Sequence, residues 1–382
     1  TLILAAAAAG LALSGDLFNI YVFYELVSVA SFGLVAVRRT GAALAATMRY
    51  LILSGFGAAL ALVGIGIVYH LTGTLNLAQL ADLGPEMLNT PIGLTAFAAI
   101  LIGVGVKAEL FPVNTWVPEV YATAPKRVSA LLAGLVSKLA VLVVVRLLVL
   151  VFHQPEALAL LLTLGMLGVI TGELAAWRAR DMSRMLAFSS IGQLGIIFIA
   201  FALPGQAGLM AGLAMALHHL VVKPALFLLA ERWGGSLEGL TGAAHRSPLG
   251  AALFVLFALS LVGVPPLPGF WAKLLVITGL AGQPDSLYLT AMAVILVATV
   301  VEAGYLFRVV TRLYQRRDEG DTRAAVPGHE NLDLGTASAF GVALLAAVVL
   351  LVPLSEGLQA IATQAADTGR YISIVFPGGV TP

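Results

Sequence analysis

The sequence contains no cysteine and few charged residues. The absence of cysteine among 382 residues excludes disulfide bonds, thiolate zinc sites and cysteine-ligated iron–sulfur clusters. Only 11% of the residues are charged, whereas a soluble domain has roughly 25%. Because 60% are hydrophobic and the mean hydropathy is +0.99, a soluble globular fold is excluded.

The hydrophobic residues occur in continuous runs, without the alternating polarity of a transmembrane β-barrel. A membrane-spanning helix needs about 20 apolar residues, and the runs between polar or Gly/Pro breaks predict about eleven helices of this kind. We therefore expect an all-α polytopic membrane protein. The predicted spans are residues 2–14, 17–37, 50–71, 92–111, 128–152, 157–177, 185–203, 208–231, 249–281, 288–311 and 335–352.

Every second connection lacks both lysine and arginine. These connections are 15–16, 72–91, 153–156, 204–207 and 282–287. The alternate connections hold Arg38, Arg39, Arg49, Lys126, Arg127, Arg178, Arg180, Arg184, Arg232, Arg246, Arg312, Arg316, Arg317 and Arg323. Basic loops stay in the cytoplasm, so we expect the connections with lysine and arginine on the cytoplasmic side of the cell (inner) membrane. The C-terminal tail is then expected on the outer side.

The predicted spans form two groups of five. An odd number per group makes the second group an inverted repeat of the first, as in many transporters. The fourth span of each group is interrupted by proline, in VKAELFPVNTWVP (106–118) and VGVPPLPGFWAK (262–273). Chance could also place two such breaks in these positions, but we interpret them as the functional centre.

The repeats define three predicted regions of the chain. Residues 1–152 are the first repeat, 153–315 the second, and 316–382 a cytoplasmic loop, a final helix and the tail. The chain begins at Thr1 without an initiator methionine, so we expect a truncated or processed start that lacks part of the first repeat.

Four of the five lysines and one glutamate lie within predicted spans, namely Lys107, Lys138, Lys223, Lys273 and Glu25. A charge at the bilayer centre costs roughly 2.5–3.5 kcal/mol, so these side chains must face protein or water. A buried lysine can release its proton, whereas arginine keeps its charge, which favours a proton-carrying role for the lysines. The alternatives are paired structural lysines or, for Lys107 and Lys273, side chains that reach the membrane surface.

Three other charged residues receive structural interpretations. Glu173 and Glu302 lie far from both breaks and are interpreted as structural, and Lys126 is expected in a cytoplasmic loop, where its loss should matter little.

Two histidines precede Lys223 in ALHHLVVKPALF. His219 and Lys223 are four residues apart and share a helix face, and Pro224 disturbs the hydrogen bonding of the preceding turn. An imidazole beside a lysine can act as a proton shuttle, so we interpret His218 and His219 as relay residues. A histidine packed in the core is the alternative, and a metal pair is disfavoured because adjacent helical side chains diverge.

The sequence lacks the usual marks of cofactor or nucleic-acid binding. No P-loop, Rossmann fingerprint or nucleophile elbow is present, and the net charge is only +1. We therefore expect no cofactor, no resident metal and no nucleic-acid partner.

Five segments carry a resemblance to a known family. They are DLFNIYVFYELVSVASF (16–32), GVKAELFPVNTWVPEVYATAPKRVSALLAGLVSKLAV (105–141), RMLAFSSIGQLG (184–195), HHLVVKPALFLLA (218–230) and GVPPLPGFWAKLLV (263–276). They resemble the antiporter-like subunits shared by Mrp-type cation/proton antiporters and respiratory complex I. DLFN before Glu25, together with Lys273, makes the chain most similar to the Mrp D subunits.

The resemblance implies roles for the intramembrane residues. Glu25 and Lys107 correspond to the family's ion pair of the first half-channel, and Lys138 to the central lysine of the next span. The middle helix of the second repeat supplies His218, His219 and Lys223, and Lys273 corresponds to the terminal channel residue. Further N-terminal helices are usual in the family, and Glu109 and Glu119 depart from its pattern.

Three functions compete on this basis. We favour an ion-translocating subunit of a multisubunit Na+ or K+/proton antiporter. The alternatives are a proton-pumping membrane subunit of a complex I-like or hydrogenase-like redox complex, with catalysis on other subunits, and a proton-coupled partner in inorganic-carbon uptake. Each implies other membrane subunits, lipid, protons and monovalent cations as partners, and a transporter subunit in preference to an enzyme.

Overall fold

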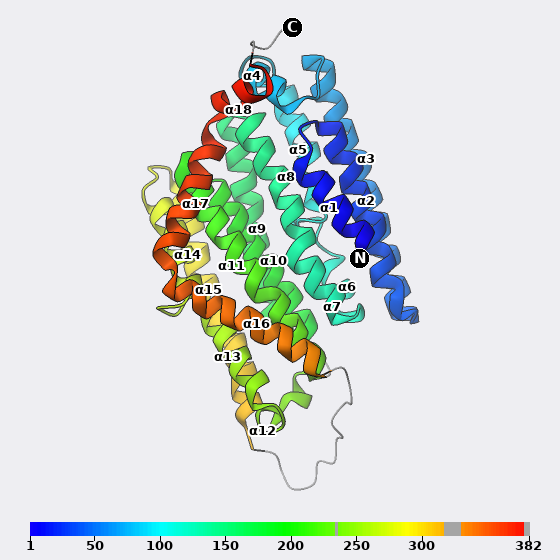
Figure 1. The fold of residues 1–382 in the computed structure, drawn as a ribbon, viewed down its shortest axis with the longest axis vertical. Helices are drawn as coiled ribbons and strands as arrows, with labels where there is room; N and C mark the ends of the chain where they lie inside the picture. Colours follow the sequence, from blue (N-terminus) through cyan, green and yellow to red (C-terminus); the bar gives the residue numbers. More distant parts are fainter. Residues whose placement is uncertain (234–235, 317–329, 378–382) are drawn as a thin grey trace.

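The computed structural model describes residues 1–233, 236–316 and 330–377, and within these ranges it contains helices and no strand. Long helices run side by side along the long axis of the molecule (Figure 1). The helices are α1 (Leu2–Leu13), α2 (Leu17–Val35), η1 (Ala36–Arg38), α3 (Gly41–Thr72), α4 (Leu77–Met87), α5 (Pro91–Gly105), α6 (Val117–Thr123), α7 (Lys126–Leu131), η2 (Leu132–Val136), α8 (Ser137–Leu150), α9 (Pro155–Arg178), α10 (Met182–Phe201), α11 (Gly205–Arg232), η3 (Glu238–Leu240), α12 (Ala243–Arg246), α13 (Pro248–Val262), α14 (Pro268–Ala281), α15 (Ser286–Tyr314), α16 (Glu330–Val349), α17 (Leu351–Ala366) and α18 (Thr368–Val375).

Eight helical stretches in the described ranges are long and apolar enough to cross a membrane. Each coincides with a predicted span, and the other three predicted spans fall on the shorter apolar helices α1, α5 and the pair α13–α14. The all-α polytopic fold is confirmed. The total of eleven crossings and the division into inverted repeats stay predictions.

Both predicted interruptions are present. Helix α5 ends at Gly105 and α6 begins only at Val117, whereas α13 and α14 are separated by residues 263–267. Proline has no N–H to donate to a preceding turn, so helix cannot continue through either proline-rich stretch. Gly263 adopts a left-handed conformation (φ 90°) that ends α13. Each break also contains a cis peptide bond, Phe111–Pro112 and Pro265–Pro266.

Helix α10 lies in the middle of the bundle, and almost all of its residues are buried. It packs along α9 and α11, which flank it in Figure 1. Glycines allow the backbones of α9 and α10 to approach closely, since a Cβ at Gly195 would lie 2.6 Å from the carbonyl oxygen of Gly165. The polar residues of α10 therefore lie in the interior, where they can contact the intramembrane lysines.

The C-terminal helices differ from the single crossing predicted at residues 335–352. Helix α16 lies obliquely across α11 and α13, and α17 then continues toward the end where α18 packs on α4 (Figure 1). Pro353 explains the division, because its missing N–H stops the helix near Leu350. The sequence alone did not predict α17 and α18.

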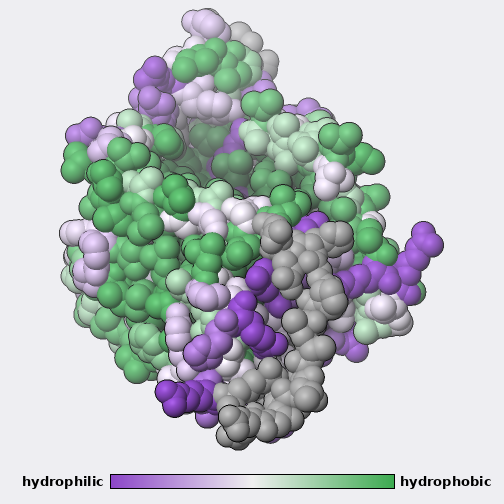
Figure 2. Space-filling view, turned by 60° about the horizontal axis from the view of Figure 1, so that its bottom comes forward, coloured by the Kyte–Doolittle hydropathy of each residue, from purple (hydrophilic) through white to green (hydrophobic). Residues whose placement is uncertain are grey.

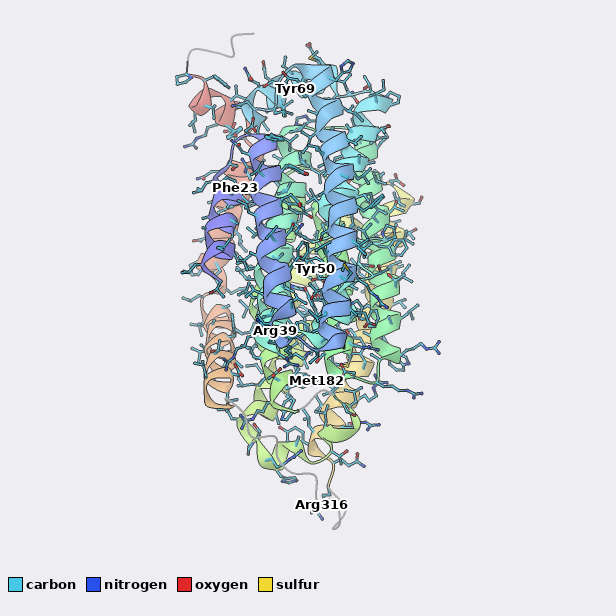
Figure 3. All side chains as sticks on the ribbon, turned by 90° about the vertical axis from the view of Figure 1, so that its right-hand side faces the viewer. Phe23, Arg39, Tyr50, Tyr69, Met182 and Arg316 are labelled. Carbon is cyan, nitrogen blue, oxygen red and sulfur yellow. The ribbon has the colours of Figure 1, made fainter. Side chains whose placement is uncertain are left out.

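The polar and apolar surfaces match a membrane protein with its basic connections at one end. Hydrophobic side chains cover wide areas, and hydrophilic ones gather beside the end that carries α12 (Figure 2). Arg39, Met182 and Arg316 lie toward this end, and Tyr69 lies toward the other (Figure 3). Three ion pairs join elements near the basic end: Arg38–Glu231 (2.9 Å), Arg127–Asp333 (2.7 Å) and Arg184–Glu119 (3.5 Å).

The close packing of α9 on α10 makes a testable prediction. Gly195→Ala should lower the free energy of unfolding in detergent by about 1–3 kcal/mol, because neither backbone can easily yield to the added Cβ. Gly66→Ala is the matched control: on the exposed side of α3 its Cβ meets no described atom within 4 Å, so it should be neutral or stabilise by up to about 1 kcal/mol. Thermal unfolding measures both variants, and equal losses would contradict the packing argument.

Candidate functional site

The predicted intramembrane residues meet in the interior of the bundle, where they form a series of polar contacts. Lys107, His219, Lys223 and Lys273 are at most 4% exposed, and Lys138 is partly buried. The proposal that two of these lysines reach the membrane surface therefore fails. Each of the four lysines approaches a different acceptor.

Glu25 and Lys107 form an ion pair across α2 and the first break. Lys107 Nζ lies 3.8 Å from Glu25 Oε1 and 3.4 Å from the centroid of the Tyr24 ring, so both an anion and an aromatic face stabilise the ammonium. The Tyr24 hydroxyl donates to the Val104 carbonyl (3.0 Å), which fixes α2 against the end of α5. Lys107 Nζ has no hydrogen-bond partner among the described residues.

Lys138 contacts His219 where the span that contains α8 widens into the π-helical turn η2. The Ala133 carbonyl in this turn accepts from Lys138 Nζ at 2.6 Å and from Ser137 Oγ at 2.8 Å. Lys138 Nζ also contacts Nδ1 of His219, and His219 Nε2 lies 3.3 Å from Ser190 Oγ on α10. An ammonium that donates to Nδ1 leaves the imidazole neutral, with its remaining proton on Nε2 and directed at Ser190.

Lys223 begins a second series of contacts. Its Nζ donates to Ser189 Oγ (2.6 Å), which lies 2.7 Å from the Tyr305 hydroxyl. The Tyr305 hydroxyl donates to Glu173 Oε2 at 2.9 Å. These contacts connect α11, α10, α15 and α9 through buried polar groups.

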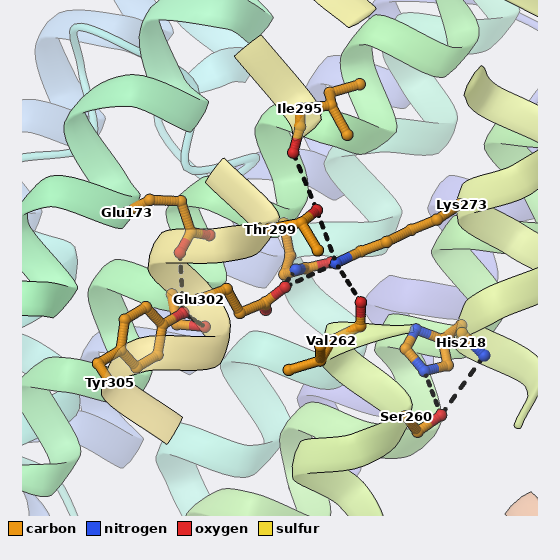
Figure 4. Close-up of polar contacts among 12 residues, drawn as sticks. Glu173, His218, Ser260, Val262, Lys273, Ile295, Thr299, Glu302 and Tyr305 are labelled. Carbon is orange, nitrogen blue, oxygen red and sulfur yellow. Dashed lines mark hydrogen bonds and ion pairs between the residues drawn. The ribbon is translucent and has the colours of Figure 1, made fainter. Parts of the chain in front are cut away.

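Lys273 forms a shorter ion pair than Lys107 does. Its Nζ lies 2.7 Å from Glu302 Oε2, and Glu302 Oε1 accepts from Gln193 Nε2 at 2.6 Å. The Thr299 hydroxyl and the Val262 carbonyl, which the second break leaves free, each lie 3.5 Å from Nζ. Figure 4 shows Lys273 and Glu302 pointing toward one another, with Glu173 and Tyr305 close by.

His218 and His219 face different partners. His218 Nε2 lies 2.9 Å from Ser260 Oγ, and it closely covers Gly269, where a Cβ would come within 2.8 Å of this nitrogen. The two imidazoles bond to different hydroxyl groups, and no hydrogen bond between His219 and Lys223 occurs among the described residues.

The comparison with known families is decisive for the identity of the fold. Residues 14–303 match the family described as NADH:quinone oxidoreductase/Mrp antiporter, transmembrane. The chain belongs to this family.

The relatives include subunits of NADH-quinone oxidoreductases and subunits of Na(+)/H(+) antiporters. The N subunit of the NADH-quinone oxidoreductase of Desulforudis audaxviator is 34% identical over 80% of this chain and 62% of its own length. The D subunit of the Na(+)/H(+) antiporter of Bacillus subtilis is 30% identical over 93% of this chain and 71% of its own length. The chain spans only 55% of the corresponding D subunit of Alkalihalophilus pseudofirmus, at 32% identity.

Two solved structures extend the similarity to the three-dimensional fold. A chain of the membrane-bound sulfane sulfur reductase, an archaeal respiratory membrane complex, has a TM-score of 0.88 at 31% identity, covering 97% of this chain and 76% of that one. A chain of the Mrp complex from a Dietzia species has a TM-score of 0.87 at 27% identity, covering 98% and 78%. The antiporter-family resemblance drawn from the motifs is thus confirmed.

Sequence reasoning missed several polar residues of this antiporter-family site. Glu173 and Glu302 were interpreted as structural from the sequence. In the structure, Glu173 accepts from Tyr305, which also contacts Ser189 beside Lys223, and Glu302 pairs with Lys273. Thr299, Glu302 and Tyr305 recur every three residues in the apolar middle of α15, which was the available signal. The others that sequence reasoning missed are Ser189, Ser190, Gln193, Tyr121 and the buried Glu109.

Lys126 is not the solvated loop residue that the sequence predicted. It is 6% exposed, and its Nζ donates to the carbonyls of Tyr121 (2.6 Å) and Ala122 (2.8 Å). The C-terminal end of α6 leaves these carbonyls without helical partners and carries a partial negative charge, which explains why a cation folds over it. Lys126 is therefore a structural residue, and its substitution is expected to disturb the end of α6.

The Lys273–Glu302 pair makes a prediction about stability. Glu302→Met should lower the free energy of unfolding by about 3–5 kcal/mol, because it leaves a buried ammonium without its anion. The double variant Lys273→Met/Glu302→Met should recover most of this loss, since two apolar side chains of similar volume need no compensation. Unfolding of the purified variants in detergent measures both. A double variant as unstable as Glu302→Met would contradict the pairing.

Proposed function

We propose that this chain is an ion-translocating subunit of a multisubunit Na+ or K+/proton antiporter. The observation that carries the proposal is the series of buried lysines, each facing an acceptor of its own: Glu25, His219, Ser189 and Glu302. Lysine releases its proton far more readily than arginine in an apolar interior, so a row of buried lysines suits proton carriage. The similarity to the D subunits of Na(+)/H(+) antiporters supports the choice of a monovalent cation as the second ion.

Translocation begins, in this proposal, at the Glu25–Lys107 pair. While the carboxylate stays close, it stabilises the ammonium, and separation of the two groups favours release of the proton. The proton then moves through Lys138 and His219 toward Lys223 and leaves by way of Lys273. Hydroxyl groups lie beside two of these residues: Ser190 contacts His219, and Ser189 contacts Lys223 and Tyr305. Water would have to complete the path between them.

The exposure of Glu25 supports a second membrane subunit as the partner of this chain. Its side chain is 33% exposed, and Val22, Leu26 and Val29 on the same helix are at least 40% exposed. A charged group facing lipid near the bilayer centre costs roughly 2.5–3.5 kcal/mol. A further membrane-embedded helix that covers this face of α2 removes that cost, and another subunit is the source that we propose; lipid covers the remaining apolar surface.

A redox-driven proton pump is the second candidate function. The similarity to the N subunit of NADH-quinone oxidoreductase and to a chain of the sulfane sulfur reductase complex favours it. In that case the same residues move protons, and catalysis takes place on other subunits. The two candidates differ in whether transport needs Na+ or K+ or an electron donor.

Transport by membrane vesicles that contain the whole complex separates the two candidates. In the antiporter, added Na+ or K+ should dissipate a preformed pH gradient, as followed with a pH-sensitive dye. Lys273→Ala should abolish the response, because it removes the last proton carrier. Arg246→Ala, at an exposed position outside the spans, should leave the response unchanged. A gradient that responds to an electron donor and never to Na+ or K+ would contradict antiport and favour the pump.

The first ion pair predicts a graded series of variants. Lys107→Arg keeps the positive charge beside Glu25 but cannot shed it, so transport should fall at least about 10²-fold. Glu25→Gln should also block turnover, because it removes the anion that stabilises the ammonium, whereas Glu25→Asp keeps the charge and should retain partial activity. The measurement is vesicle transport, with assembly checked on native gels. Full activity in Lys107→Arg would leave Lys107 as a structural counter-charge only.

A further inference from the structure

Glu109 is a buried acid that the proposed relay does not use. It lies in the break between α5 and α6 and is 1% exposed. We propose that Glu109 is a further proton-carrying residue, which connects Lys107 to the Lys138–His219 pair. This inference rests on the proposed function and assigns one more residue to the same path.

Among the described residues, one carboxylate oxygen of Glu109 accepts a hydrogen bond and the other does not. Oε1 accepts from the Tyr121 hydroxyl at 2.6 Å, and Tyr121 is itself fixed edge-on between the rings of Trp116 and Phe227. Oε2 is buried and has no hydrogen-bond partner among the described residues. A buried carboxylate oxygen without a donor is costly in a merely structural group, but it is the atom at which a proton can be taken up.

The neighbours of Glu109 include the groups of the Lys138–His219 pair. The buried carboxylate lies within electrostatic range of the Lys138 and Lys223 ammonium groups and close to Ser190. Ser190 Oγ lies 3.3 Å from His219 Nε2, and His219 contacts Lys138. Lys107 precedes Glu109 by two residues in the same break and points toward Glu25.

The backbone of Glu109 has an unusual conformation for a residue with a side chain. Its φ is 57°, in the left-handed region that non-glycine residues seldom adopt because Cβ crowds the backbone. Glycine would make the same turn without this steric cost. This strain, together with a buried carboxylate that has a donor at only one described oxygen, supports a functional role for Glu109.

The proton transfers balance in atoms and charge. Lys107 Nζ and Glu109 Oε2 make no hydrogen bond among the described residues, so the proposed transfer runs through bridging water. The Lys107 N–H bond breaks, each water gives up one proton as it receives another, and an O–H bond forms at Oε2. An ammonium and a carboxylate thereby become an amine and a neutral acid. With Lys138 as the neutral amine, His219 carries its proton on Nδ1 and its Nε2 can accept. The proton leaves Oε2 through the Ser190 hydroxyl to Nε2, and Nδ1 passes its own proton to Lys138. Glu109 is again a carboxylate, and one positive charge has moved from Lys107 to Lys138.

The test compares two glutamates of the same region in the intact complex. Glu109→Gln keeps the size of the side chain and its contact with Tyr121 but cannot carry a proton, so transport per assembled complex should fall at least about tenfold. Glu109→Asp should regain part of the rate. The control is Glu119→Gln: Glu119 lies on α6, is 36% exposed and pairs with Arg184 at 3.5 Å, so transport should match the unaltered complex.

A spectroscopic measurement separates proton carriage from a structural role. Infrared difference spectra between low and high pH should contain a carbonyl band of a protonated carboxyl group, which Glu109→Gln removes and Glu119→Gln keeps. Transport by Glu109→Gln at the unaltered rate and with the unaltered pH profile would overturn the inference. If Glu109→Gln does not assemble, Tyr121→Phe decides: it withdraws the donor to Oε1 and should shift the pH profile, and an unshifted profile overturns the inference.

Failure of this inference differs from failure of the proposed function. If the unaltered complex and Glu119→Gln both translocate ions and Glu109→Gln does as well, only the role of Glu109 is wrong. If the unaltered complex translocates no protons under cation or electron-donor conditions, the proposed function itself is wrong, and the inference fails with it.

Discussion

The need to compensate buried ammonium groups governs the interior of this protein. An uncompensated charge in an apolar bundle would cost more than several packing contacts provide, so each intramembrane lysine requires its own acceptor. Helix α10 supplies three of the polar groups involved: Ser189 for Lys223, Ser190 for His219, and Gln193 for Glu302. A helix that is buried on nearly all sides can do this only because its neighbours approach closely, which the glycines of α9 and α10 permit.

The irregular turns of the helices contribute acceptors as well as shape. In a regular helix each interior carbonyl already accepts a backbone N–H, so it binds a lysine less readily than a carbonyl at an irregular turn. The Ala133 carbonyl of the π-helical turn accepts from Lys138, and the Val262 carbonyl at the second break lies 3.5 Å from Lys273 Nζ. At the first break, the Val104 carbonyl holds Tyr24, whose ring covers Lys107. Each interruption thus lies beside a lysine and helps to stabilise it.

The sequence predicted much of the fold because hydrophobic runs and prolines act locally. The positions of the spans, both breaks and the family followed from these signals and from the motifs. The contacts of Glu302 and Lys126 could not be predicted in full. The spacing of Thr299, Glu302 and Tyr305 indicates a polar face, but which helix this face meets depends on the tertiary packing. Lys126 shows the limit well: charge and position predict a loop, but nearby carbonyls at the end of α6 bury it.

The ion pairs of Lys107 and Lys273 differ in exposure and in separation. Lys107 is 1% exposed and its partner Glu25 is 33% exposed, so the first pair can be opened by whatever covers α2. Lys273 and Glu302 are both at most 5% exposed, at a shorter separation of 2.7 Å, and Gln193 and Thr299 hold them as well. Because Coulomb attraction weakens with distance and exposure, a movement in a neighbouring subunit would disturb the first pair far more than the last. Under the proposed function, an event at the exposed face of α2 therefore acts first on the Glu25–Lys107 pair, and Lys273 responds after charge has moved along the interior.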